Sequence, residues 1–229
     1  MKRVIVTGSQ GFIGTYLCCE LLNHNYQVVG IDNFSKYGPV VRPHDNHPNF
    51  TLITEDISKN TSKWPVSEVN YVISLAASIG GISYFSQFPY SLYDTNENIN
   101  SNVFLQAKKY FQHGFLDRLV VVSSSMVYER AETWPTKESD LESMGPPLSS
   151  YGFQKLSCEI RAKALYDEFG VPYTIVRPFN AVGAYEDEAL SSSEVFSGNV
   201  KLQLSHVLPD LINKCIKGQD PLHILGTGQ

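Results

Sequence analysis

Short apolar runs alternate with longer stretches of helical periodicity along this chain. Most of the short runs are continuously apolar rather than alternating, which is typical of strands covered on both faces. The runs that we expect to form strands are Val4–Val6, Gln27–Ile31, Thr51–Ile53, Tyr71–Leu75, Leu119–Val122, Tyr173–Val176 and Leu222–Leu225.

The stretches between these runs carry apolar residues at helical spacing. The first has its apolar residues at positions 12, 13, 16, 17 and 21, which form one face of a helix. Similar patterns predict helices over Ile99–Tyr110 and Gln154–Phe169. Alternation of strands and helices indicates βαβ units, a parallel sheet and right-handed crossovers. We therefore predict an α/β fold with a doubly wound parallel sheet.

Composition and charge narrow the possible partners. The chain has 229 residues, of which 42% are hydrophobic and 18% charged, so an intrinsically disordered chain is excluded. Its net charge is -5, and Lys and Arg never cluster beyond two adjacent residues. We therefore expect neither a nucleic acid nor an acidic membrane surface as partner. No apolar run approaches the roughly 18 residues that a membrane span needs.

The four cysteines do not form a metal or disulfide pattern. They are Cys18, Cys19, Cys158 and Cys215, with no C-x-x-C and no histidine at ligand spacing from a cysteine pair. We expect no metal site, and instead reduced, buried or half-buried thiols in a cytoplasmic protein. Three long polar loops, at 33–49, 129–149 and 183–199, have the length of functional lids or disordered segments.

A glycine-rich segment follows the first expected strand and opens the first helix. Gly8, Gly11 and Gly14 have the spacing G-x-x-G-x-x-G, which suits a Rossmann-like loop whose backbone approaches a pyrophosphate. A tight turn without a ligand is the alternative. Asp32 closes the second strand, where a carboxylate can accept hydrogen bonds from ribose hydroxyls and would repel a 2′-phosphate. Together these features predict a dinucleotide site that favours NAD over NADP.

Further motifs extend over almost the whole chain. They are Thr7–Gly14, Asp32–Ser35, Asp56-Ile57, Leu75-Ala76-Ala77, the serine-rich segment Ser123–Tyr128, the Y-x-x-x-K of Tyr151–Lys155, and Arg177–Asn180. In these motifs the sequence resembles the extended short-chain dehydrogenase/reductases, and within them the NAD-dependent nucleotide-sugar epimerases and dehydratases of the UDP-glucose 4-epimerase type.

The resemblance implies a set of binding residues. Those expected to bind the cofactor NAD are Gly8, Gly11, Phe12, Ile13, Gly14, Asp32, Asn33, Asp56, Ile57, Leu75, Ala76, Ala77, Asn96, Tyr151, Lys155 and Pro178. Those expected to bind a nucleotide-diphosphate sugar are Gly81, Ser124, Ser125, Asn180 and His206. Asn98, Asn100 and Asn102 are alternatives to Asn96, and a surface helix position is the alternative for His206.

The resemblance also has departures. Ser74 stands where the family usually has His, and Glu129 stands where it usually has Gly, which we expect to reshape the substrate loop. Family members continue beyond the G-x-G-x-Q segment at which this chain stops. We therefore expect an NAD-binding domain over residues 1–178 and a small, truncated C-terminal substrate-binding part over 179–229.

The Y-x-x-x-K motif gives the expected chemistry. Spacing i, i+4 places Tyr151 and Lys155 on one helix face. A free phenol has a pKa near 10, and a nearby ammonium and the positively charged nicotinamide ring both stabilise its phenolate. Tyr151 is expected to take a proton from a sugar hydroxyl, Lys155 to assist it and hold the nicotinamide ribose, and Ser124 to bond the reacting oxygen. A one-residue slip would give that role to Ser125.

The residues after the catalytic hydroxyl separate the possible reactions. Dehydratases of the family tend to carry an Asp-Glu pair there, whereas this chain has Ser125 and Met126, which cannot relay a proton at neutral pH. A 4-epimerase working through a transient 4-keto sugar is therefore favoured. A 4,6-dehydratase or 4-keto reductase, and a non-catalytic sensor of NAD or nucleotide sugar, remain alternatives. The resemblance further implies a homodimer that pairs the helices 96–110 and 151–169.

Overall fold

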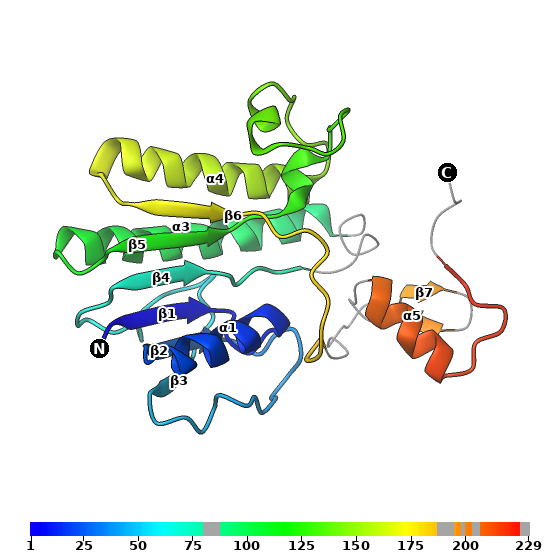
Figure 1. Cartoon of the computed structure of the whole chain (residues 1–229), viewed down its shortest axis with the longest axis horizontal. Coiled ribbons are helices and arrows are strands. Elements are labelled where there is room, and N and C mark those ends of the chain that lie inside the picture. The colour runs from blue at the N-terminus through cyan, green and yellow to red at the C-terminus, as the bar shows by residue number, and fades with distance from the viewer. Residues whose placement is uncertain (80–87, 187–194, 198–199, 203–206, 225–229) are drawn as a thin grey trace.

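Six parallel strands form the sheet at the centre of the molecule (Figure 1). This computed structural model describes residues 1–79, 88–186, 195–197, 200–202 and 207–224. The strands are β1 (Arg3–Thr7), β2 (Gln27–Asp32), β3 (Phe50–Thr54), β4 (Tyr71–Ser74), β5 (Arg118–Val122) and β6 (Tyr173–Val176). They lie in the order β3-β2-β1-β4-β5-β6, and every neighbouring pair is parallel. The predicted Rossmann-like sheet is thus confirmed.

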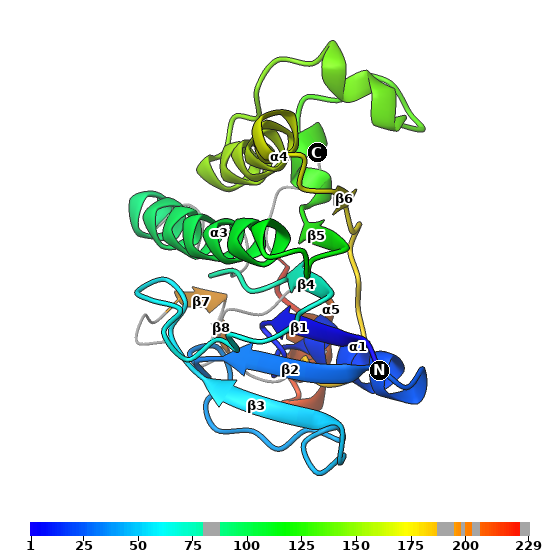
Figure 2. The same cartoon turned by 90° about the vertical axis from the view of Figure 1, so that its left-hand side faces the viewer.

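Helices cover both faces of this sheet (Figure 2). The helix α1 (Phe12–Asn23) lies on one face, and α3 (Pro89–Gln112) and α4 (Ser150–Phe169) lie side by side on the other. A hydrophobic core lies on each face of the sheet, and alternate residues of β1 point into one or the other. Val4 and Val6 pack with Cys18 of α1, whereas Ile5 packs with Val103 of α3. This two-sided burial explains why the strands are continuously apolar in sequence.

The order of the strands indicates where a ligand would bind. The chain runs from β1 outward to β3 and then crosses back to β4, so the direction reverses between β1 and β4. In open α/β sheets, ligands bind beyond the carboxyl ends of the strands at such a switch point. The segments that follow β1, β2, β4 and β5 all lie at this edge of the sheet.

The remaining elements follow the sheet or its loops. Two short 3-10 helices, η1 (Ser125–Tyr128) and η2 (Glu138–Glu142), lie between β5 and α4. An antiparallel pair, β7 (Val195–Ser197) and β8 (Val200–Leu202), and a helix, α5 (Val207–Ile216), come after β6. These last three elements were not predicted from the sequence.

Two of the predicted elements need correction. The strand expected at 222–225 is wrong, because Leu222 and Ile224 are exposed and belong to no strand; Leu225 lies outside the described residues. The middle helix begins at Pro89, ten residues before the expected Ile99. Its start was missed because Asp94–Asn98 are all polar and interrupt the apolar spacing.

The cysteines are all free, as expected for reduced thiols. Cys18 and Cys158 are buried and Cys19 is half-buried, but Cys215 is exposed, which corrects the expectation that every thiol is at least half-buried. Burial raises the pKa of Cys158 to about 11. Within the described part of the chain, no group of three or more His, Cys, Asp or Glu side chains could hold a metal ion. The described helices include none with the length and apolarity of a membrane span.

Candidate active site

The loop between β1 and α1 requires glycine for steric reasons. Gly8 has a φ of 73°, in the left-handed region that favours glycine. A Cβ added to Gly14 would lie 2.1 Å from the carbonyl oxygen of Gly8, so α1 packs directly on the loop. Gly11 is the N-cap of α1 and makes no side-chain capping bond, which leaves the first N–H groups of the helix available. An anionic group such as a pyrophosphate fits this helix N-terminus.

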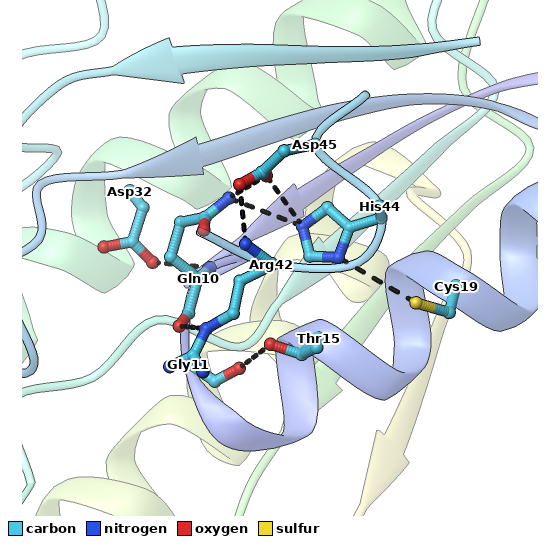
Figure 3. Close-up of polar contacts among 8 residues, drawn as sticks. All are labelled: Gln10, Gly11, Thr15, Cys19, Asp32, Arg42, His44 and Asp45. Atoms are coloured by element: carbon cyan, nitrogen blue, oxygen red, sulfur yellow. Dashed lines mark hydrogen bonds and ion pairs between the residues drawn. The ribbon is translucent and has the colours of Figure 1, made fainter. Parts of the chain in front are cut away.

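Asp32 fixes the relation between this loop and the end of β2. One carboxylate oxygen accepts a hydrogen bond from the backbone N–H of Gln10 at 2.9 Å (Figure 3). The other accepts one from the backbone N–H of Phe34 at 2.8 Å. Burial raises the pKa of Asp32 above the ordinary value of an aspartate, although these backbone N–H groups act in the opposite direction. A partly buried carboxylate at this position can accept further hydrogen bonds from a ribose.

The long loop after β2 is fastened to the glycine-rich loop. Arg42 donates from Nε to the carbonyl oxygen of Gln10 at 3.0 Å, and the Gln10 amide donates to Asp45 at 3.0 Å (Figure 3). The Arg42 guanidinium also lies over the rings of Tyr37 and Tyr185. These contacts place the segment as a wall beside the glycine-rich loop.

The segments after β3 and β4 form the next part of the site. The hydroxyl of Thr7 accepts hydrogen bonds from the backbone N–H groups of Leu75 and Ala76, each at 3.0 Å, which holds the end of β4 against β1. Asp56 and Ile57 follow β3, and the Ile57 side chain is buried in the core. Burial alone would raise the pKa of Asp56, but hydrogen bonds from Ser58 and Lys59 outweigh it and lower that pKa.

Asn96 supports the segment after β4 from helix α3. Its side-chain oxygen accepts a hydrogen bond from the backbone N–H of Ser78 at 2.7 Å, and its amide donates to the Ser78 carbonyl at 2.9 Å. The side chain is 1% exposed. These two bonds give Asn96 a role in shaping the site and distinguish it from Asn102, whose amide donates to the Ile57 carbonyl.

Tyr151 and Lys155 lie on the face of α4 that is turned toward the sheet. Both are buried, at 4% and 7% exposure. The Lys155 ammonium donates to the carbonyl oxygen of Val122, the last residue of β5, at 2.8 Å. It also lies 5.8 Å from the centre of the Tyr151 ring. The helix thus places an ammonium next to a phenol at the carboxyl end of β5.

Ser124 lies close to the same helix turn. Its hydroxyl caps η1 by accepting a hydrogen bond from the Met126 N–H at 3.2 Å. A Cβ added to Gly152 would lie 2.7 Å from the Met126 carbonyl oxygen, so the first turn of α4 packs directly on η1. Through this contact the segment of Ser124 meets the helix turn that begins with Tyr151. The N–H of the neighbouring Ser125 donates to the carbonyl of Pro178 at 3.1 Å.

Glu129, one of the departures from the family pattern, contacts the start of α4. Its carboxylate accepts hydrogen bonds from the backbone N–H and the hydroxyl of Ser149, at 2.8 and 3.0 Å. Ser149 is the N-cap of α4 and accepts from the Gly152 N–H at 3.0 Å. Glu129 therefore ties the end of η1 to the helix that carries Tyr151. The other departure, Ser74, is buried as the last residue of β4.

Of the remaining predicted residues, the structure describes some and not others. Phe12 and Ile13 begin α1, where the Phe12 ring approaches Gly183. Asn33 and Asn180 are exposed, and Asn180 has a φ of 40°. Gly81 and His206, both expected at the sugar, lie outside the described residues.

Two features of the site were not predicted from the sequence. The first is the Thr7 hydroxyl, whose signal is a polar residue at the end of a buried apolar strand. The second is the buried ion pair of Glu159 and Arg177, with oxygen–nitrogen distances of 2.9 and 2.7 Å. Glu159 follows Lys155 by four residues, so its position on the buried helix face is the available signal.

Comparison with known proteins identifies a matching family and similar relatives. A model of the NAD dependent epimerase/dehydratase family matches residues 4–229. The chain is 31% identical over 196 residues to the uncharacterized protein MJ1055 of Methanocaldococcus jannaschii, covering 80% of this chain and 58% of that protein. It is 28% identical to the uncharacterized UDP-glucose epimerase YtcB of Bacillus subtilis, covering 99% of this chain and 66% of that protein.

Two solved structures are also similar over nearly the whole chain. One is the UDP-N-acetylglucosamine 4-epimerase of Methanobrevibacter ruminantium in complex with UDP-N-acetylmuramic acid, with a TM-score of 0.76 and 28% identity, covering 96% of this chain and 64% of that one. The other is the UDP-glucuronic acid 4-epimerase of Bacillus cereus in complex with NAD and a fluorinated UDP-sugar, with a TM-score of 0.76 and 26% identity, covering 99% and 66%. This chain therefore spans about two thirds or less of these relatives.

Proposed function

Because the chain belongs to the NAD dependent epimerase/dehydratase family, we propose that it takes part in the 4-epimerisation of a nucleotide-diphosphate sugar. The observation that carries this proposal is the position of the Lys155 ammonium beside the Tyr151 ring at the end of β5, next to the segment that bears Ser124. Lys155 bonds the Val122 carbonyl beside the Tyr151 ring, and Gly152 packs on η1, which Ser124 caps. A phenol, an ammonium and a hydroxyl suit proton transfer to and from an alcohol.

The residues of the switch point fit the cofactor NAD. The glycine-rich loop and the N-terminus of α1 suit the pyrophosphate, and Asp32 suits the adenosine ribose. Asp56 and Ile57, which follow β3, would contact the adenine, and the segment after β4 would contact the nicotinamide end. Bound NAD supplies the acceptor and donor of hydride for an alcohol carbon.

Each catalytic residue has a separate role in the proposed reaction. The Tyr151 phenolate takes the proton of the sugar 4-hydroxyl while hydride leaves the same carbon. The Lys155 ammonium stabilises that phenolate and has further N–H donors for a ribose hydroxyl. Ser124 donates a hydrogen bond to the reacting oxygen. The 4-keto sugar then turns, and hydride and proton return to the opposite face, which inverts C4.

The residues beside Ser124 favour this reaction over water loss. Elimination of water needs an acid and a base next to the keto carbon. Ser125 engages the Pro178 carbonyl through its backbone, and neither its hydroxyl nor the Met126 thioether is an acid or base at neutral pH. We therefore propose inversion at C4 rather than 4,6-dehydration or net reduction.

The test of this proposal has two stages. Ligands released from the purified protein are identified by mass spectrometry, and products are then analysed with a panel of UDP-, GDP- and dTDP-hexoses. The expected result is bound NAD and a C4 epimer of one sugar class. A 6-deoxy-4-keto product would contradict the proposal in favour of dehydration. Bound NAD without turnover of any sugar would favour a non-catalytic sensor.

The raised pKa of Asp32 leads to a pH prediction for NAD binding. The ribose hydroxyls need the ionised carboxylate, and burial makes this carboxylate take up a proton at a higher pH than the 3.8 of an ordinary aspartate. NAD affinity should therefore fall on acidification, and the fall should begin at a higher pH than that at which an exposed aspartate takes up a proton. Calorimetric titration of NAD across pH measures this effect. Asp32→Asn should weaken binding and remove this part of the pH dependence, and an unchanged profile in the variant would refute the assignment.

We also propose that two copies of the chain associate through α3 and α4. These helices lie side by side (Figure 2) and expose large apolar residues. Leu105 on α3 is 49% exposed and Ile160 on α4 is 60% exposed. Light scattering should give the mass of a dimer, and Ile160→Lys should shift it toward the monomer. A monomer mass for the unaltered protein at high concentration would contradict this interface.

A further inference from the structure

Two successive turns of α4 are tied to two successive residues at the end of β5. Lys155 donates to the carbonyl of Val122, and one turn later Glu159 accepts a hydrogen bond from the hydroxyl of Ser123. The next residue along the chain is Ser124, the proposed catalytic hydroxyl. The strand end and the helix that carries Tyr151 are therefore connected by hydrogen bonds immediately beside the reacting groups.

Glu159 is also the centre of a buried ion pair. Arg177, which follows β6, donates from Nε and Nη2 to the two carboxylate oxygens, at 2.9 and 2.7 Å. The side chains of Glu159 and Arg177 are 8% and 19% exposed. A bidentate pair of a planar guanidinium and a carboxylate fixes both distance and orientation. This pair joins α4 to the carboxyl end of β6.

The same guanidinium reaches the 3-10 helix that Ser124 caps. Arg177 donates from Nη1 to the hydroxyl of Tyr128, and the guanidinium lies 5.1 Å from the centre of the Tyr128 ring. Tyr128 is the last residue of η1 and is buried. Ser124 is thus held from both sides, through Ser123 before it and through η1 after it, and both connections end on the Glu159–Arg177 pair.

We propose that Glu159 and Arg177 are positioning residues that hold Ser124 in register with Tyr151 and Lys155. Stability alone is a weak explanation for the pair, because apolar residues of similar volume often replace a buried ion pair without loss of stability. Its fixed geometry and its contacts to Ser123 and Tyr128, on either side of Ser124, are what an apolar pair could not supply. This inference deepens the proposed function and rests on it for the roles of the three catalytic groups.

The first variant is Glu159→Gln, which keeps the shape of the side chain and removes its charge. We expect kcat to fall roughly 10- to 100-fold, since a displacement of about 1 Å in a catalytic site can cost about 100-fold. KM and NAD affinity should stay within about threefold of wild type, because neither residue lies at the glycine-rich loop or Asp32. A purely structural role would reduce the amount of folded protein and leave kcat per folded molecule unchanged.

A second readout does not depend on turnover. The ionisation of Tyr151 is measured as a difference in tyrosinate absorbance. Each protein is compared with the same protein carrying Tyr151→Phe, both with NAD present. Removing the Glu159 charge would by its direct field favour the phenolate and lower the midpoint pH. Displacement of the Ser124 hydroxyl from the phenolate acts in the opposite direction, and we expect a rise of about one pH unit, a tenfold weaker acid. The sign of the shift therefore separates positioning from simple electrostatics.

Two further variants make the test decisive. Glu159→Leu combined with Arg177→Met removes both charges and keeps the core apolar, so it serves if Glu159→Gln does not fold. The matched control is Arg161→Gln, which breaks the ion pair of Arg161 with Glu97 at 2.7 Å on the same helix but has no contact to β5 among the described contacts. The control should leave both kcat and the midpoint pH unchanged.

The outcomes distinguish this inference from the proposed function. A raised midpoint in Glu159→Gln or in the double variant, with an unchanged Arg161→Gln, supports positioning. A midpoint that falls or stays constant in a folded variant overturns it. If wild type turns over no activated hexose, the proposed function fails, whereas the absorbance titration still decides whether the pair positions Ser124 against Tyr151.

Discussion

Tyr151→Phe is expected to lower kcat for epimerisation by roughly 10²- to 10⁴-fold, the range that a general base contributes. The substitution removes only the phenol oxygen, and the aromatic ring keeps its buried place on α4, where Tyr151 is 4% exposed. NAD binding should stay within a few-fold of wild type, because the glycine-rich loop and Asp32 are untouched. Steady-state kinetics with the identified sugar and calorimetric titration of NAD measure the two effects separately.

Tyr166→Phe is the matched control for this variant. Tyr166 lies on the same helix but is 52% exposed, so loss of its hydroxyl should leave kcat unchanged. A Tyr151→Phe protein with wild-type kcat would exclude the phenol as the base. Loss of activity accompanied by loss of NAD binding would instead indicate damage to the cofactor site.

Gly14→Ala is expected to weaken NAD binding about 100-fold or more, equivalent to roughly 2.8 kcal/mol. The added methyl group would lie 2.1 Å from the Gly8 carbonyl oxygen and 2.9 Å from the Ser9 Cα. Backbone atoms cannot move aside as a flexible side chain can, so α1 must withdraw from the loop that faces the pyrophosphate. The same overpacking should lower the free energy of unfolding by about 1–3 kcal/mol. Calorimetric NAD titration and thermal unfolding measure the two losses.

Gly145→Ala provides the comparison. A Cβ at Gly145 approaches only the Arg130 side chain, at 3.3 Å, and the flexible guanidinium can shift. NAD affinity and the unfolding temperature should therefore remain close to wild type. Wild-type NAD affinity in Gly14→Ala would mean that the loop does not hold the pyrophosphate.

The sheet could be predicted from the sequence because its strands are buried on both faces. Residues such as Ile5 and Val6 serve opposite cores, so the strand is apolar throughout and short enough to be distinguished from a helix. The same rule failed at Leu222 and Ile224, since an apolar run forms a strand only where a neighbouring strand is available. The early turns of α3 were missed because Asp94–Asn98 are all polar and interrupt the apolar spacing before Ile99.

The site was only partly predictable from the sequence. Glycines and acids at strand ends carry strong local signals, and the structure brings Gly8, Asp32 and Gln10 together as that pattern indicates. Arg42 carries no such signal, because a charged residue in sequence usually lies at the surface. Its burial depends on partners distant in sequence, which only the folded chain shows.

The central claim is that hydride leaves C4 of the sugar and returns to it while Tyr151 handles only the hydroxyl proton. The most direct test follows a nucleotide-diphosphate hexose that carries deuterium at C4, with product analysis by NMR. The account predicts a C4-inverted sugar that retains its deuterium, because the label moves to the cofactor and back. A C4 epimer in which solvent hydrogen has replaced the deuterium would contradict it, since that result requires a base that removes a proton from carbon.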